Sequence, residues 1–160
     1  MKRILITGAS SGIGLEAARL LACSGHPLTL LCRTPERGEQ TRAHLLAGGA
    51  TSSQVTCRVA DLADLRSVQS ACDQLLDRSE PLDALVLNAG QQRAGAAAPV
   101  WSGNPDAYKR ALLKDYPQGK AARFIRPEEV AELVWYLCGP QAEAITGADL
   151  AVDFGLSAGR

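Results

Sequence analysis

The chain has 160 residues, enough for one domain that buries most of its apolar surface and too few for two ordinary domains. We therefore expect a single domain over residues 1–160. Its 17 basic and 17 acidic side chains cancel, and neither sign forms a long run, so the charge pattern favours neither nucleic acid nor a membrane surface as a partner. The expected partner is a small molecule.

Cysteine usage and the N-terminal segment predict a soluble, cytoplasmic protein. The five cysteines form no C-x-x-C pair and stand among apolar neighbours, as buried thiols do in a reducing compartment. No segment approaches the length of a membrane span, and residues 1–10 run directly into a strand pattern. His26 and His44 have no cysteine or acidic partner at metal-ligand spacing, so no metal site is predicted.

Strand and helix patterns alternate through the first 90 residues. Apolar runs predict strands at residues 4–6, 28–32, 55–59 and 82–87. Helical patterns lie between them at residues 15–23, 35–48 and 65–76, and Thr34 is placed to cap the second helix. Four strands joined by three helices imply parallel, right-handed crossovers and a sheet covered on both faces. The prediction is a Rossmann-like, doubly wound α/β fold.

The alternation fails after Gly90. Residues 91–103 are rich in Ala, Gly and Gln and predict a loop, and a short helix is expected over residues 104–114. Pro127-Glu128-Glu129 opens a better helix, which Gly139-Pro140 closes. Residues 149–154 predict a last strand. The sheet would then have about five strands.

A glycine-rich loop, Thr7-Gly8-Ala9-Ser10-Ser11-Gly12-Ile13-Gly14, stands between the first predicted strand and the first predicted helix. Glycines let the backbone turn tightly and approach a pyrophosphate closely, and the helix N-terminus presents N–H groups to the anion. A glycine triplet alone is weak evidence, but strand, loop, helix and strand within the first 32 residues is the context of a dinucleotide site.

These residues resemble the short-chain dehydrogenase/reductase family. Residues 7–14 match its T-G-x-x-x-G-x-G motif, and three further landmarks follow in order: Asp61-Leu62, Asn88-Ala89-Gly90 and ITGADLAVDFG at residues 145–155. The resemblance implies that the glycine loop holds the cofactor phosphates, that Asp61 and Leu62 flank the adenine, and that residues 88–90 line the cofactor cleft. The cofactor-binding residues expected in these segments are Gly8, Ser10, Ser11, Gly12, Ile13, Gly14, Asp61, Leu62, Asn88, Ala89 and Gly90.

Arg33 indicates which cofactor is bound. NAD sites usually place a carboxylate at the end of the second strand for the ribose hydroxyls, whereas the 2′-phosphate of NADP needs a cation. Arg33 occupies this position, with Thr34 and Arg37 as further phosphate partners nearby. We expect NADP. The alternative is that Arg33 is a solvated residue at a strand end.

The catalytic part of the family pattern is missing. In the family, a much longer stretch than residues 91–127 carries the catalytic serine and a Tyr-x-x-x-Lys helix, so this chain resembles an internal deletion with its seam near residues 101–104. Tyr116 and Lys120 have the spacing of the catalytic pair, but Pro117 and Gly119 disfavour a continuous helix there. Ser102 lies at a similar spacing, yet no strand pattern precedes it. No catalytic residue is therefore assigned.

Three functions remain open. The first is a dinucleotide-binding protein that has lost the reacting half of its site. The second is an NADPH-dependent reductase of a small carbonyl substrate, which uses Tyr116 and Lys120 or residues of a second subunit. The third is a structural role through an exposed sheet edge. We expect the last strand to pair beside the fourth in the order 3-2-1-4-5, with pairing between two chains in a homo-oligomer as the alternative.

Overall fold

The computed structural model describes residues 1–77, 81–90 and 123–153. The chain divides into two compact units, one formed by Met1–Gly90 with Pro127–Ala144 and the other by Gln91–Arg126 with Ile145–Arg160. The first unit contains all the helices and strands described below. The prediction of a single domain stays a prediction.

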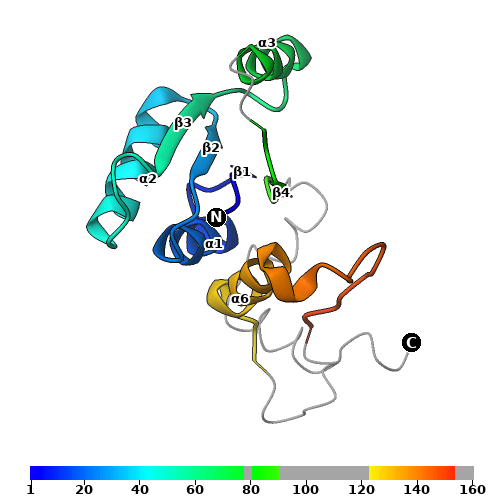
Figure 1. Ribbon diagram of the computed structural model, residues 1–160. Coiled ribbons are helices and arrows are strands. Elements are labelled where there is room, and N and C mark those ends of the chain that lie inside the picture. Colours follow the sequence, from blue (N-terminus) through cyan, green and yellow to red (C-terminus); the bar gives the residue numbers. More distant parts are fainter. Residues whose placement is uncertain (78–80, 91–122, 154–160) are drawn as a thin grey trace, which may run out of the picture. The chain divides into compact units, whose positions relative to one another are not determined.

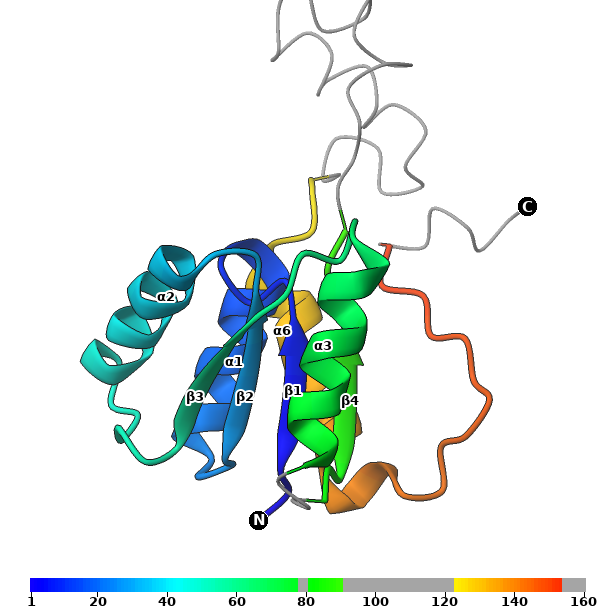
Figure 2. The ribbon, with the colours of Figure 1, turned by 90° about the horizontal axis from the view of Figure 1, so that it is seen from above.

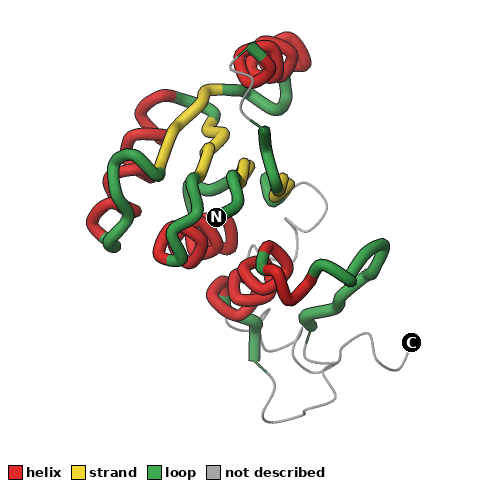
Figure 3. Tube along the Cα trace, viewed as in Figure 1, coloured by secondary structure: helices red, strands yellow, loops and turns green. Residues whose placement is uncertain are grey.

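The first unit is built on a parallel sheet (Figures 1 and 3). Its strands are β1 (Ile4–Thr7), β2 (Leu28–Cys32), β3 (Val55–Val59) and β4 (Ala84–Leu87). They are arranged in the order β3-β2-β1-β4. The helices are α1 (Gly12–Cys23), α2 (Pro35–Ala47), α3 (Leu65–Leu76) and α6 (Pro127–Cys138), with a 3-10 helix η2 at Pro140–Ala142. The predicted Rossmann-like α/β class and the order of these elements are confirmed.

One face of the sheet carries the core. Figures 1 and 2 show α1, α2 and α6 on this face and α3 on the other. Side chains alternate between the faces of a strand, so the core face collects every second residue of each strand. The fully buried members are Ile4, Ile6, Leu28, Leu30 and Val55, each at most 2% exposed, and they pack with Leu21 of α1 and Leu45 of α2.

The face toward α3 is covered less completely than predicted. Leu85 and Leu87 of β4 lie on it and are 55% and 76% exposed. In register with them on β1, Leu5 and Thr7 are buried. Helices thus lie on both faces of the sheet, as predicted, but within the described residues α3 leaves these two side chains of β4 exposed.

The starts of two predicted elements differ from the structure. Helix α1 begins at Gly12, not Leu15, with Ser11 as its N-cap. Strand β4 begins at Ala84, not Leu82, because Asp83 caps the end of the sheet: its carboxylate accepts a hydrogen bond of 2.6 Å from the Arg3 N–H. Predicted strand ends carry an uncertainty of this size because local pattern alone defines them.

The predicted last strand is not formed over Asp149–Asp153, and Phe154 lies outside the described residues. A strand needs a neighbour for its backbone N–H and C=O groups, and none pairs with this segment in the described part of the chain. The order 3-2-1-4-5 is thus wrong for these residues, and the described sheet has four strands. Within the described residues no helix has the length and apolar character to cross a bilayer.

Candidate dinucleotide site

The candidate site lies at the carboxyl edge of the sheet. All strand pairs are parallel, so the segments that follow β1, β2, β3 and β4 meet at one edge. These segments contain every predicted cofactor-binding residue.

The loop after β1 takes a path that needs glycine. Gly8 has φ +69° and Gly12 has φ +55°, values that residues with a Cβ rarely adopt. A Cβ on Gly12 would meet no atom within 4 Å, so the space beside this residue is open. The backbone here can therefore be approached closely by a ligand.

Gly8 and Gly14 are required for a different reason, which is close packing against the segment after β4. A Cβ on Gly8 would lie 2.7 Å from the Cα of Ala89. A Cβ on Gly14 would collide with Asn88 Nδ2 and the Gly8 carbonyl oxygen. Gly8 and Gly14 thus allow the loop to pack closely against the end of β4, whereas Gly12 leaves open space on the solvent side of the loop.

Hydrogen bonds fix the same junction. Asn88 Nδ2 donates to the carbonyl oxygens of Thr7 and Gly8, each at 3.2 Å. The Ala89 N–H donates to Thr7 Oγ1 at 2.9 Å. Thr7 is only 4% exposed, and its hydroxyl lies 3.5 Å from the Val86 carbonyl oxygen to which it donates. Asn88 and Thr7 therefore hold β4 against the glycine loop.

The first turn of α1 is open to solvent. Ser11, Gly12 and Ile13 are exposed, and the Ser11 side chain makes no capping hydrogen bond. No acidic residue stands in this turn. The first N–H groups of a helix have no partner within it, and with the helix dipole they attract anions. This end of α1 can hold a phosphate.

Arg33 and Asp61 follow β2 and β3 and lie side by side. Arg33 Nε is 3.7 Å from Asp61 Oδ1, and the two side chains are 60% and 43% exposed. Such an exposed pair contributes little to stability, so Arg33 remains available to a ligand. Asp61 Oδ1 also accepts from the Ala63 N–H at 3.0 Å, and Leu62 is 45% exposed.

Thr34 is used by the fold. It is the N-cap of α2, and its Oγ1 accepts from the Arg37 N–H at 3.4 Å. Glu36 follows in the first turn, where hydrogen bonds from its own backbone N–H and from Thr34 lower the pKa of its carboxyl group. A carboxylate at a helix N-terminus is favourable. The hydroxyl of Thr34 is thus engaged in capping.

One face of α2 meets the glycine loop around a cavity of about 210 Å³. Ser10 and Leu15 line one side, and the α2 side is lined by Arg37, Gln40, Thr41 and His44. The spacing of these four residues, i, i+3, i+4 and i+7, places them on one helix face. Sequence reasoning missed Gln40 and His44, although this spacing was the signal that could have found them.

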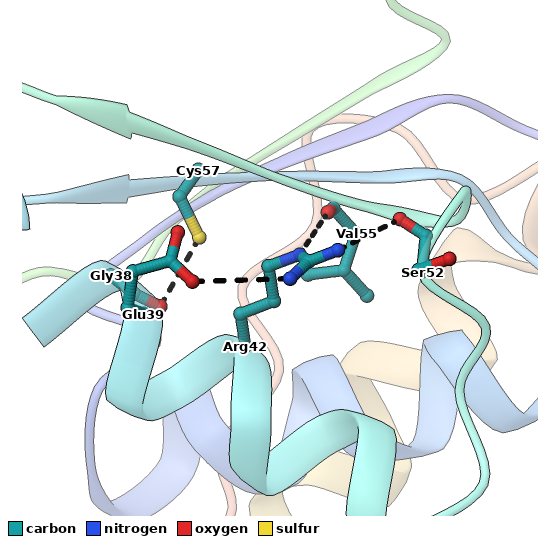
Figure 4. A network of polar contacts seen from close by, with 6 residues as sticks. All are labelled: Gly38, Glu39, Arg42, Ser52, Val55 and Cys57. Carbon is teal, nitrogen blue, oxygen red and sulfur yellow. Dashed lines mark hydrogen bonds and ion pairs between the residues drawn. The ribbon is translucent and has the colours of Figure 1, made fainter.

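Helix α2 is held on β3 by a small polar network (Figure 4). Arg42 Nε donates to the Val55 carbonyl oxygen at 3.2 Å, and its Nη2 donates to that of Ser52 at 3.4 Å. Cys57 Sγ contacts the Gly38 carbonyl oxygen at 3.2 Å. A Cβ on Gly38 would lie 3.2 Å from that of Cys57. Close helix-strand packing thus fixes α2, whose Arg37 lines the cavity beside Ser10.

The structure brings together the segments after β1 and β4, and separately those after β2 and β3. Ser102, Tyr116, Lys120 and the proposed seam at 101–104 lie outside the described residues, and so does the predicted helix over 104–114. The role of Thr7 was missed, because a threonine at a strand end carries no signal for a contact with a residue 82 positions later.

The sequence of the chain is similar to known proteins. A family model described as short chain dehydrogenase matches residues 2–108, and one described as Enoyl-(Acyl carrier protein) reductase matches residues 102–157. Retinol dehydrogenase 14 of Mus musculus is 40% identical over 98 residues, which are 56% of this chain and 29% of that protein. A putative ketoacyl reductase of the granaticin polyketide synthase of Streptomyces violaceoruber is 42% identical over 96 residues, 60% of this chain and 34% of that protein.

Solved structures agree in fold. A variant of actinorhodin polyketide ketoreductase, crystallised with NADPH, superposes with a TM-score of 0.77 at 21% identity, covering 97% of each chain. Glucose dehydrogenase of Caenorhabditis elegans in its apo form gives 0.72 at 23% identity, covering 98% of each chain.

The parallel sheet, with helices on both faces and a glycine-rich loop after β1, defines a Rossmann-like α/β protein. The chain belongs to the short-chain dehydrogenase family, because the matched residues 2–108 are more than half of it. The predicted family is therefore confirmed. The chain spans 29% and 34% of the length of the two curated relatives above.

Proposed function

We propose that this chain binds NADP(H) at the carboxyl edge of its sheet. The observation that carries the proposal is the junction between the glycine loop and Asn88-Ala89, which leaves the first turn of α1 open to solvent beside Gly12. The residues proposed to hold the phosphates are Gly8, Ser10, Ser11, Gly12, Ile13 and Gly14. The adenine would lie beside Asp61 and Leu62, and the cleft would be lined by Asn88, Ala89 and Gly90.

The choice of NADP over NAD rests on cations at the end of β2 and the start of α2. Arg33 is 60% exposed and has only a weak partner in Asp61, and Arg37 lines the cavity beside Ser10. A phosphate accepts several charge-assisted hydrogen bonds from such groups. A ketoreductase with this fold was crystallised with NADPH, which is in line with the choice. Because the Thr34 hydroxyl caps α2, Thr34 would contact the cofactor phosphate through its backbone and not through its side chain.

The chemistry of a bound nicotinamide is hydride transfer. In this site the chain's own residues would bind and orient the cofactor. The N–H groups at the start of α1 would neutralise phosphate charge, and Asn88 fixes the glycine loop that precedes these groups. Proton donation at the carbonyl oxygen would need a tyrosine-lysine pair or an equivalent. We propose that this second part is deficient here, because residues 91–127 are far fewer than the family usually places between these landmarks.

An active carbonyl reductase is the second candidate. The observation in its favour is that the reductase family model matches residues 102–157, which include Tyr116 and Lys120. In that case Tyr116 would donate the proton, and Lys120 would lower its pKa and bind the ribose. Pro117 stands against it, because a proline inside a helix removes a hydrogen bond and clashes with the preceding turn.

NADPH titration followed by nicotinamide fluorescence, run beside reduction of an aldehyde and a ketone, tests both candidates. Saturable binding with reduction near background is the expected result, and Tyr116→Phe should lower the rate no further. No binding of NADPH would refute the proposed function. Steady turnover that Tyr116→Phe abolishes would establish the second candidate instead.

A further inference from the structure

The sheet face toward α3 changes character from one side to the other. On β1 and β4 it carries three leucines, Leu5, Leu85 and Leu87, and Thr7 at the carboxyl end of β1. On β2 and β3 it carries two hydroxyls and a cation, because Thr29 pairs with Thr56, and Leu31 pairs with Arg58. Strands covered on both faces are usually apolar throughout. Figure 2 shows α3 in front of β1 and β4, and Thr56 is exposed, so the polar half is the part of this face that the described helix leaves open.

A cavity of about 300 Å³ lies against this polar half. It opens at the amino edge of the sheet, where β1 and β2 begin and β3 is entered, and thus at the edge opposite to the glycine loop. Among the described residues, its lining contains two arginines, three hydroxyls and one amide, and no carboxylate. The lining residues are Arg3, Pro27, Leu28, Thr29, Ser53, Gln54, Thr56, Arg58, Leu75 and Leu82.

Arg58 supplies an independent observation. Its Nε is buried and has no hydrogen-bond partner, alone among the buried side-chain nitrogen and oxygen atoms of the described residues. A buried donor on a charged group is costly to leave unsatisfied. The nearby amide of Gln54 offers no acceptor to spare, since its Oε1 already accepts from the Thr51 N–H and hydroxyl. Asp83 is likewise bound to the Arg3 N–H.

We propose that this cavity is a second binding site, for a small oxyanion held by the guanidinium of Arg58. The planar fork of an arginine matches the oxygens of a phosphate or a carboxylate, and Thr29 and Thr56 add hydroxyl donors on the same face. The volume lies at the lower end of the range of small-ligand pockets. The ligand class is thus a phosphate monoester or a small carboxylic acid, bound apart from the proposed cofactor site.

The test is an NMR titration of the full ¹⁵N-labelled chain with sodium phosphate and, in a second series, sodium acetate, at constant ionic strength. We expect the Arg58 Nε–H signal and the amides of Thr29 and Thr56 to shift saturably, with a Kd of about 1 mM or tighter for one of the two anions. The anion that saturates identifies the class. Phosphate bound at the start of α1 would instead shift the amides of residues 12–14.

Arg58→Gln should weaken this binding at least tenfold, whereas Arg66→Gln, a matched change at an exposed arginine of α3, should leave it unchanged. Circular dichroism checks that both variants are folded. If Arg58→Gln does not fold, the response of the Arg58 signal in the parent protein alone tests the proposal. The proposal is overturned if the Arg58 signal does not respond, or if it shifts only linearly with concentration. It is equally overturned if Arg66→Gln weakens binding as much as Arg58→Gln, which would indicate general screening around a cavity that holds water only.

Discussion

At the scale of single residues, the three glycines of the loop have two separate duties. Gly8 and Gly14 allow the chain to pack against Ala89 and Asn88, while Gly12 has a positive φ and open space around it. A side chain on Gly14 would strike the chain's own backbone, so Gly14→Val is expected to destabilise the fold as well as the site. Gly12 is the better position at which to examine ligand binding alone.

Arg33 is the residue on which cofactor choice depends. Arg33→Asp should weaken NADPH binding by about 1.5–3 kcal/mol, the size of a lost charge-assisted contact, with little effect on NADH. Arg66→Asp, which makes the same charge change at an exposed site on α3, is the control. Calorimetric titration with each cofactor measures the effect. Equal affinities of the parent for NADPH and NADH would rule out the role of Arg33.

The cysteines differ in reactivity because they differ in burial. Burial raises the pKa of Cys57 to about 11, with the nearby Cys32 as a lesser cause, and burial also raises the pKa of Cys32 and Cys138. Cys23 and Cys72 are exposed. Since the thiolate is the nucleophile, iodoacetamide at pH 8 should label Cys23 and Cys72 rapidly and the other three slowly, as mass spectrometry will report. Fast labelling of Cys57 in the native protein would contradict this assignment.

The raised pKa of Cys57 makes the stability of the fold depend on pH in the alkaline range. A thiol whose folded pKa lies above its unfolded value disfavours the thiolate in the native state, so its contribution is fully present below the unfolded pKa. For Cys57 the free energy of unfolding should fall as pH rises from about 9 toward 11. Cys57→Ala should flatten this part of the stability curve measured by urea denaturation.

At the scale of elements, α2 is placed on the sheet by Arg42. Arg42→Met keeps much of the apolar stem but loses the donors to Val55 and Ser52, so we expect the free energy of unfolding to fall by about 1–2 kcal/mol. Glu39→Gln is the control, because the Glu39 side chain is 71% exposed and its Oε2 is 3.9 Å from Arg42 Nη1, and such a pair contributes little. Urea denaturation followed by circular dichroism compares them. An equal loss in both variants would mean that the ion pair, not the backbone contacts, holds α2.

The local sequence pattern was sufficient to predict the helices and strands of the described unit and their order along the chain. Thr34 and Pro35 mark the start of α2, and apolar residues at helical spacing mark α3, because capping and amphipathicity are encoded within a few residues. Contacts distant in sequence were not predictable in this way. The bonds from Asn88 to residues 7 and 8 join positions 80 and more apart, and the last strand failed because strand formation depends on a neighbour.

At the scale of the whole molecule, the described unit contains the four-stranded parallel sheet and the proposed cofactor site at its carboxyl edge. The two family matches meet at residues 102–108, which includes part of the seam predicted near 101–104. Assembly into a homo-oligomer stays a prediction. The observation in favour of this prediction is that Leu85 and Leu87 are exposed apolar side chains on β4, the edge strand of the described sheet.

The most direct test of the proposed cofactor site is calorimetric titration of NADPH into the parent, Gly12→Ala and Gly49→Ala. Gly49 has φ +104° and open space beside it, like Gly12, but lies at the far end of α2. Both substitutions should cost stability, about 1–2 kcal/mol at Gly12 and more at Gly49, because φ +104° lies further than φ +55° from the left-handed region that a residue with a Cβ can adopt. Only Gly12→Ala should lose NADPH affinity, at least tenfold, while both variants keep native circular dichroism. Undiminished affinity in Gly12→Ala, or an equal loss in Gly49→Ala, would contradict the claim that the glycine loop binds the dinucleotide.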